Sequence, residues 1–400
     1  MILEHNDDIS IAITSLFMKF CGFWMATNNN ERRCRIITLI YTIIGMSFIG
    51  VVLITDLYYS REDFTVSMHI LIHILILLAH RKDFFHLVLY LQREFLHGDY
   101  DVYEKTILAG CKRVCALFIC VFTCFAHATL ISYVISPIVG KNESDRLLPF
   151  TMWLDLVSTT PYFEITFVLQ ALSLYQVGIC YFCFDNFLCI INLHVSCQFR
   201  ILQYRLTNMN IAKYVHSENS ETSTSHGTDK YHTMFINCIQ KHQALIAYCD
   251  KLEEVFSSFS LGQLLVFSSL ICLDGYQVLM ANAPIARRLI FIFHIIGCTA
   301  QLLMFTYSCD CLIQDSKNVS SAMYASPWPR LSMDKNGKTI RKDLILMMLR
   351  SKIPCCLTAR KFCVVSLETY TGLLTFKVPP LLNFFLENAQ DFGGMSIHQK

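Results

Sequence analysis

The hydrophobic and polar positions of the chain alternate in long blocks. Apolar runs with few or no charges occupy residues 36–55, 64–80, 114–136, 165–184, 255–280, 289–308 and 366–386. Because an α-helix rises about 1.5 Å per residue, about 20 residues cross the roughly 30 Å hydrocarbon core of a bilayer. The pattern therefore predicts an all-α, polytopic membrane protein with seven transmembrane helices in a lipid bilayer.

Several polar segments between these runs also have a helical pattern. Residues 83–113, 185–206 and 231–254 are periodic enough to continue their neighbouring spans beyond the membrane, and residues 339–349 form an amphipathic helix. Residues 10–26 are apolar but interrupted by Lys19 and Gly22, which favours an interfacial or re-entrant helix. The polar, low-complexity stretch 217–229 is predicted to be disordered.

Composition supports the membrane assignment and excludes other classes. Hydrophobic residues make up 54% of the chain and charged residues only 16%, whereas about a quarter is usual in soluble proteins. The formal net charge of +2, without basic runs interleaved with aromatics, gives no reason to expect nucleic-acid binding. The acidic start, MILEHNDDIS, lacks the basic and apolar regions of a cleavable signal peptide, so we expect the first span to direct insertion.

The distribution of Lys and Arg predicts the orientation of the helices. Of the 33 basic residues, 26 fall on one side and 6 on the other, with Lys377 inside the last run. The positive-inside rule then places the N-terminus in the cytoplasm and the C-terminus outside. The predicted divisions are a cytoplasmic segment (1–35), spans one to six (36–308), a cytoplasmic linker (309–365), the last span (366–387) and an extracellular tail (388–400).

Two N-glycosylation sequons provide a check on this orientation. Asn142 lies in a loop predicted to face outside and is the candidate glycosylation site. Asn318 lies in the cytoplasmic linker and is expected to stay unmodified.

The 19 cysteines are dispersed in apolar runs and predicted cytoplasmic segments. This placement predicts free thiols that pack as small hydrophobic side chains and not a disulfide framework. Cys180 and Cys183 form a CxxC pair without a second such pair, which does not indicate a zinc site.

The last apolar run contains polar and helix-breaking residues that a simple anchor would not need. Lys377 lies in its middle and is followed by Pro379 and Pro380. A charged group at this depth usually faces protein or water. Helical spacing places a candidate pore face on one side of this run: Tyr370, Leu373, Leu374, Lys377 and Leu381. The alternative is a buried bundle helix with a lysine that reaches the membrane surface.

An ordered set of motifs over residues 307–386 resembles the C-terminal region of insect odorant receptors. These motifs are Tyr307-Ser308-Cys309, Asp315-Ser316, AMYASPW ending at Trp328, RKDLILMMLRSKIP, LTARKF and SLETY. FMKFCGFW near the N-terminus and YFCFDNFLCIINLH at residues 181–194 resemble the same family, in particular the set expanded in ants, bees and wasps.

The resemblance implies a tetrameric, ligand-gated cation channel in the plasma membrane of olfactory sensory neurons. This chain would be a tuning subunit that assembles with a shared co-receptor subunit, mainly through cytoplasmic helices such as those of residues 309–365. Residues 366–370 match the start of the family's pore helix. Its gate would fall near Asn383 to Leu386, where Pro379, Pro380 and Asn383 depart from the family pattern, so the position of the gate stays open.

The same resemblance places a small hydrophobic odorant in the outer half of the helix bundle. Aromatic and histidine side chains of the outer halves of the spans are the candidate ligand-binding residues: Phe64, His69, His73, His127, Tyr133, Tyr162, Phe167, Tyr276, Phe291 and His294. An apolar pocket with few polar groups suits a small volatile or a hydrocarbon. His69 and His73 have the spacing of two metal ligands but lack a third, so we expect no metal and no other cofactor.

Other classes of membrane protein fit the sequence less well. A gustatory receptor shares the topology and a C-terminal Thr-Tyr motif, but the region before SLETY is closer to odorant receptors. An enzyme would need His127 or His294 to meet Asp185 or Asp274, and the sequence offers no nucleophile motif. A transporter with inverted repeats does not fit an odd number of spans, and a G-protein-coupled receptor would have the reverse orientation.

Overall fold

The computed structural model describes residues 9–24, 28–60, 87, 90, 100–139, 162–209, 224–280, 285–326, 328 and 335–375. These residues are mostly helical, with one isolated antiparallel bridge between Thr358 and Val364. The helices are α1 (Ile9–Phe20), α2 (Asn29–Ser60), α5 (Val102–Val139), α6 (Tyr162–Thr207), α8 (Thr224–Met280), α9 (Ile285–Ala325) and α10 (Lys335–Ser351). Residues 367–375 are also helical.

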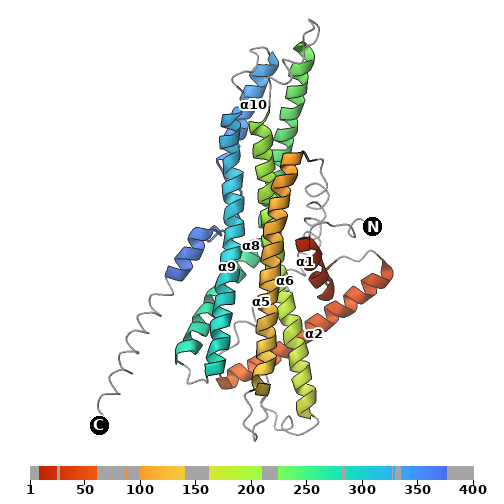
Figure 1. The fold of residues 1–400 in the computed structure, drawn as a ribbon, viewed down its shortest axis with the longest axis vertical. Coiled ribbons are helices and arrows are strands. Elements are labelled where there is room, and N and C mark those ends of the chain that lie inside the picture. Colours follow the sequence, from red (N-terminus) through yellow and green to blue (C-terminus); the bar gives the residue numbers. More distant parts are fainter. Residues whose placement is uncertain are drawn as a thin grey trace, which may run out of the picture.

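Four long helices form the body of the molecule. Helices α5, α6, α8 and α9 run along its long axis (Figure 1), and they are 38, 46, 57 and 41 residues long. Each contains a segment long and apolar enough to cross a membrane: Val102–Ser132, Tyr162–Thr207, Thr233–Gly275 and Phe291–Ala325. About 20 residues suffice for that crossing, so these helices also extend beyond the bilayer.

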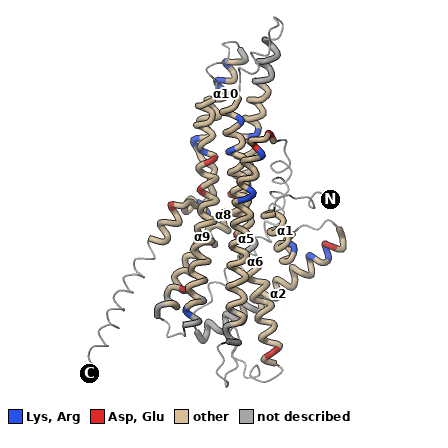
Figure 2. The backbone as a smooth tube through the Cα atoms, viewed as in Figure 1, with Lys and Arg blue, Asp and Glu red and all other residues tan. Residues whose placement is uncertain are grey.

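The ends of the bundle differ in charge. Along the four long helices, Figure 2 shows Lys, Arg, Asp and Glu mainly in the half that carries α10, with few in the opposite half among the described residues, while the start of α2 is also charged. We call these the charged half and the apolar half. The bounds of α6 and α8 confirm that these helices continue past the apolar runs, as the periodicity predicted for residues 185–206 and 231–254.

The helix near the N-terminus packs against the bundle. Helix α1 buries Ser10, Ile11, Thr14 and Met18 and lies against α5 and α6. It ends at Phe20, and Gly22 then turns the chain with a φ of 82°, where an added Cβ would lie 2.5 Å from the backbone nitrogen of Leu39. A residue with a side chain fits poorly there, because both the positive φ and the close approach to α2 require glycine.

The helix boundaries differ from the sequence predictions at three places. Helix α5 continues two residues past Pro137, because a proline in the last turn removes only one hydrogen bond of the helix. Helix α8 begins at Thr224, inside the stretch 217–229 that was predicted to be disordered. Helix α9 continues to Ala325, well into the predicted linker, whereas α10 encloses the predicted amphipathic helix 339–349.

Aromatic side chains fill the core between the long helices. Among the largest fully buried side chains are Phe199 of α6, Phe235, Phe259 and Phe267 of α8, and Phe305 of α9. Where these helices lie in a bilayer, close packing and not removal from water favours their association, so these rings hold the three helices together through van der Waals contacts. The cysteines in the described part of the chain are free thiols.

Helix α6 is tied to two neighbours by buried carboxylates in the charged half. Glu104 of α5 accepts hydrogen bonds from Nε and Nη2 of Arg205 at 2.6 and 2.9 Å. Asp315 of α9 accepts one from Nε of Arg200 at 2.7 Å and another from the hydroxyl of Ser196. Both carboxylates lie in buried residues, so their paired charges fix the registers of α5 and α9 against α6.

The loop between α10 and the last helical residues is fixed to α8. The carboxylate of Glu253 accepts hydrogen bonds from the backbone nitrogen of Thr358, at 2.8 Å, and from its hydroxyl. Earlier in the loop, the nitrogen of Cys355 donates to the hydroxyl of Ser316 at 3.0 Å. The Cys249 thiol, which donates a hydrogen bond to Cys355, holds the pKa of the Cys355 thiol below its ordinary value. The chain thus enters residues 367–375 from a position set by α8 and α9.

Candidate functional site

A polar pair lies at the apolar end of the bundle, where α8 and α9 are neighbours in a hairpin. Nδ1 of His294 is 2.7 Å from Oδ2 of Asp274, and the sulfur of Cys298 is 3.7 Å from Nε2 of His294. Asp274 is buried, while 27% of the His294 side chain is exposed. The pair therefore offers a hydrogen-bonding group to a ligand in otherwise apolar surroundings.

His127 forms a second polar spot, on the side of α5 that faces α6 and α1. Its Nδ1 lies 2.7 Å from the carbonyl oxygen of Thr123, and its Nε2 lies 3.1 Å from the hydroxyl of Tyr175 on α6. A carbonyl oxygen can only accept, so Nδ1 carries the proton and Nε2 accepts from Tyr175. The ring of Phe17 in α1 is 6.0 Å away. The two predicted ligand-binding histidines that the structure describes, His127 and His294, thus have separate partners.

For the remaining predicted ligand-binding residues, the structure gives no hydrogen bond or ring contact with His127 or with the Asp274–His294 pair among the described residues. Tyr162 is exposed, Phe167 is half-buried with its ring stacked on Phe163, and Phe291 is half-buried. Tyr133 and Tyr276 belong to α5 and α8, but their side chains are outside the described set. Phe64, His69, His73 and the glycosylation candidate Asn142 lie outside the described residues.

The predicted pore helix is described over its first turns. Ser366 starts the helical residues 367–375, and its hydroxyl accepts a hydrogen bond from the nitrogen of Thr369 at 3.4 Å, as at a helix N-terminus. Tyr370 and Leu373 are half-buried against the core, and Leu374 is half-buried as well. Four further residues of the predicted pore lie outside the described residues: Lys377, Leu381, Asn383 and Leu386.

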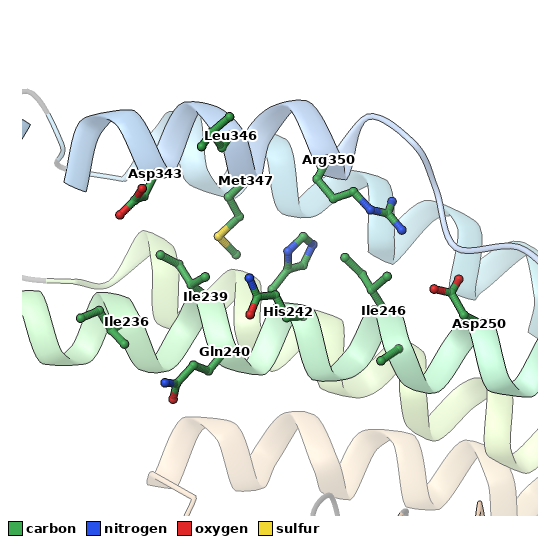
Figure 3. A pocket seen from close by; sticks show the side chains of 12 residues that line it. Ile236, Ile239, Gln240, His242, Ile246, Asp250, Asp343, Leu346, Met347 and Arg350 are labelled. Carbon is green, nitrogen blue, oxygen red and sulfur yellow. The ribbon is translucent and has the colours of Figure 1, made fainter. Parts of the chain in front are cut away.

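A cavity of about 690 Å³ lies between α8 and α10 in the charged half. Figure 3 shows Ile239, His242 and Ile246 of α8 facing Met347 and Arg350 of α10. Nε2 of His242 is 3.3 Å from the hydroxyl of Ser351. His242 is 32 residues from Asp274, about 48 Å along the helix at 1.5 Å per residue, so this cavity is distinct from the Asp274–His294 pair. The amphipathic pattern of residues 339–349 predicted a packing face here but no cavity.

A family model described as 7tm Odorant receptor matches residues 53–378. The chain belongs to the seven-transmembrane odorant receptor family. Among the relatives of this odorant receptor, Odorant receptor 13a of Drosophila melanogaster is 25% identical over 292 residues, which are 69% of this chain and 67% of that protein. Odorant receptor Or2 of Anopheles gambiae is 22% identical over 54% of this chain and 55% of its own length.

The fold of this odorant receptor is similar to a solved insect receptor. The olfactory receptor OR5 of Machilis hrabei matches it with a TM-score of 0.77, and the same protein in complex with eugenol with 0.75. Each match is 13% identical and covers 95% of this chain and 97% of the other. The likeness confirms the all-helical membrane fold predicted from the apolar runs.

Membership of the family decides between the classes left open by the sequence. The chain is a multi-pass membrane receptor and not an enzyme, even though His294 does meet Asp274, as the enzyme hypothesis required. The contact was not predictable from spacing alone, because the two residues are brought together by the register of the α8–α9 hairpin.

Proposed function

We propose that this odorant receptor is the tuning subunit of a heteromeric, ligand-gated, non-selective cation channel. It binds a small hydrophobic odorant in the apolar half of the bundle and opens a pore lined by its last helix together with a shared co-receptor subunit. The observation that carries the proposal is the Asp274–His294 pair, a buried carboxylate and a partly exposed imidazole at the apolar end of the bundle. The Machilis hrabei receptor was solved in complex with eugenol.

The proposed orientation places the charged half in the cytoplasm and the apolar half in the membrane and outside it. This arrangement follows the bias of Lys and Arg along the sequence. An odorant would then reach the Asp274–His294 pair without crossing the charged half. The plasma membrane of olfactory sensory neurons is the proposed location.

The channel assignment is tested by whole-cell current in cells that express this chain with and without the co-receptor. A panel of volatiles and long-chain hydrocarbons is applied in both cases. We expect a ligand-evoked cation current only when both chains are present. A chain that neither reaches the surface nor associates with the co-receptor would contradict the tuning-subunit assignment.

Replacing His294 by alanine is expected to raise the half-maximal concentration of odorants with a hydrogen-bonding group about tenfold. One lost hydrogen bond of roughly 1.4 kcal/mol corresponds to that factor. For hydrocarbons, which form no hydrogen bond with His294, the half-maximal concentration of the variant should lie within about twofold of the wild-type value. The measurement is a dose–response curve of the evoked current for both ligand classes.

His127→Gln is the comparison variant, because His127 is the other predicted ligand-binding histidine among the described residues. Because His127 contacts Thr123 and Tyr175 and not Asp274, we expect His127→Gln to change the responses to a different set of odorants from the set that His294→Ala affects. Equal responses of His294→Ala and wild type to every ligand with a polar group would remove the Asp274–His294 pair from the odorant site.

The outer face of α10 is proposed to contact a neighbouring subunit. Ile345 and Leu349 are one turn apart, and 56% and 54% of their surfaces are exposed. Apolar side chains on one exposed helix face are typical of an interaction surface. Ile345→Glu combined with Leu349→Glu is therefore expected to reduce co-purification with the co-receptor about tenfold.

Thr339→Glu is the control for this surface, because Thr339 is exposed on α10 but lies six and ten residues before Ile345 and Leu349, which places it on another side of the helix. It should leave co-purification within about twofold of wild type. Normal co-purification of the double variant, at equal surface expression, would place the subunit contact elsewhere.

A further inference from the structure

A cluster of sulfur and nitrogen donors lies between α5 and α6, apart from the Asp274–His294 pair. Cys111 and Cys115 are four residues apart on α5, and His194 and Cys197 are three residues apart on α6. These spacings put each pair on one face of its helix. The two helices run in opposite directions (Figure 1), and the Cys111 thiol lies 3.4 Å from the carbonyl oxygen of Leu193 on α6, so the two faces meet.

The donor atoms are close enough to share one metal ion. The sulfurs of Cys111 and Cys115 and a ring nitrogen of His194 all lie within 4.8 Å of one another. The Cys111 sulfur is 3.9 Å from Nδ1 of His194. A tetrahedral zinc ion, with bonds of about 2.3 Å to sulfur and 2.0–2.1 Å to nitrogen, places such donors about 3.5–3.8 Å apart. Side-chain movements of up to about 1 Å would bring the three donors from within 4.8 Å of one another to that separation.

Cys197 supplies a candidate for the fourth donor. It packs against Cys111 in a small cluster with Leu108 and Ile201, and the two thiols interact. We propose that Cys111, Cys115 and His194 bind Zn²⁺, and that Cys197, which lies next to Cys111 but outside this group of close donors, becomes the fourth ligand when its side chain rotates toward the ion. The ion would join the charged halves of α5 and α6.

The surroundings of the cluster suit a structural zinc site. Cys115, His194 and Cys197 are buried, and Cys111 is half-buried, so it marks the side from which an ion enters. On binding, each coordinating thiol releases its proton to solvent and a sulfur–zinc bond replaces the sulfur–hydrogen bond. No oxidation or reduction is needed.

The same helix provides a matched control. Cys120 and Cys124 repeat the four-residue spacing on α5, but both are exposed. Among the described residues, the donor groups close enough to hold a metal include Cys111 and Cys115 but not this second pair. The spacing of the two cysteine pairs is the same. They differ because His194 of α6 lies beside Cys111 and Cys115.

The test measures metal binding to the purified full-length chain in detergent. The protein is stripped with a chelator and then exposed to Zn²⁺ alone or to Co²⁺ alone. We expect about one Zn²⁺ per chain, thiolate-to-metal charge-transfer absorption with Co²⁺, and a rise of several degrees in the unfolding temperature. The variant C111S/C115S should lose all three signals, and C120S/C124S should keep them.

Thiol alkylation of the wild-type chain followed by mass spectrometry covers the case in which C111S/C115S does not fold. Zn²⁺ should protect the half-buried Cys111 at least tenfold in rate while leaving the exposed Cys120 and Cys124 unprotected. Three outcomes would overturn the proposal: no Zn²⁺ binding by the wild-type chain, equal loss in both double variants, or a Cys111–Cys197 disulfide in protein isolated without added oxidant or reductant.

Discussion

Replacing Asp315 by alanine is expected to lower the free energy of unfolding by about 3–4 kcal/mol, the sum of one lost charged hydrogen bond and one buried hydroxyl left without an acceptor. Its carboxylate bonds Arg200 and the buried Ser196, and both lie on α6. The Arg200 side chain is 54% exposed and can be hydrated, which keeps the loss below that of a fully buried pair. Thermal unfolding of the detergent-solubilised chain, followed by size-exclusion chromatography, measures the change.

Glu254→Ala is the control for Asp315→Ala. Glu254 also pairs with a base, Lys251 at 2.9 Å, but its side chain is 66% exposed. A surface pair of this kind is worth about 0–1 kcal/mol, so the unfolding temperature should hardly move. If both variants unfold at the same temperature, Asp315 does not hold α9 to α6.

Replacing Glu104 by alanine is expected to lower the free energy of unfolding by about 2–3 kcal/mol, somewhat less than the 3–5 kcal/mol typical when a fully buried pair is broken. The Glu104 side chain is only 5% exposed, and it bonds two nitrogens of Arg205. The Arg205 side chain is 36% exposed, so water can replace part of the hydrogen bonding that Arg205 loses in the variant. The same thermal assay, together with the yield of monodisperse protein, measures the effect.

Lys105→Ala tests whether that loss is specific. Lys105 follows Glu104 in the same turn of α5 but is exposed. Its removal should change the unfolding temperature by no more than a degree or two, since exposed substitutions usually stay within about 0.5 kcal/mol. Wild-type stability of Glu104→Ala would mean that the Glu104–Arg205 pair does not hold α5 to α6.

The parts of the fold that could be predicted from the sequence depend on local periodicity. Apolar runs of about 20 residues predicted the long helices, and the amphipathic residues 339–349 predicted α10, because burial on one face of a helix leaves its mark within a few turns. The continuation of α9 to Ala325 was missed for a physical reason. Asp315 reads as a loop residue along the chain, but Arg200 on another helix compensates its charge.

For the candidate odorant site, the sequence could predict the types of residue but not the contacts between them. Aromatic and histidine residues of the apolar half could be named, but the contact of His294 with Asp274 depends on how α8 and α9 pair after the chain turns between them. The cluster of Cys111, Cys115 and His194 joins residues far apart in sequence, and its spacing matches no short motif. The pore residues from Lys377 onward stay predictions.

Helix α8 is continuous from Thr224 to Met280 and carries two of the groups described above. Asp274 lies near one end, and Glu253, which holds the loop before residues 367–375, lies 21 residues away, about 32 Å along the axis. An uninterrupted helix transmits a displacement from one end to the other over that length. In the proposed channel, odorant binding near Asp274 would therefore also displace the loop that Glu253 holds before the pore helix. One helix would then contribute both to odorant affinity and to channel opening.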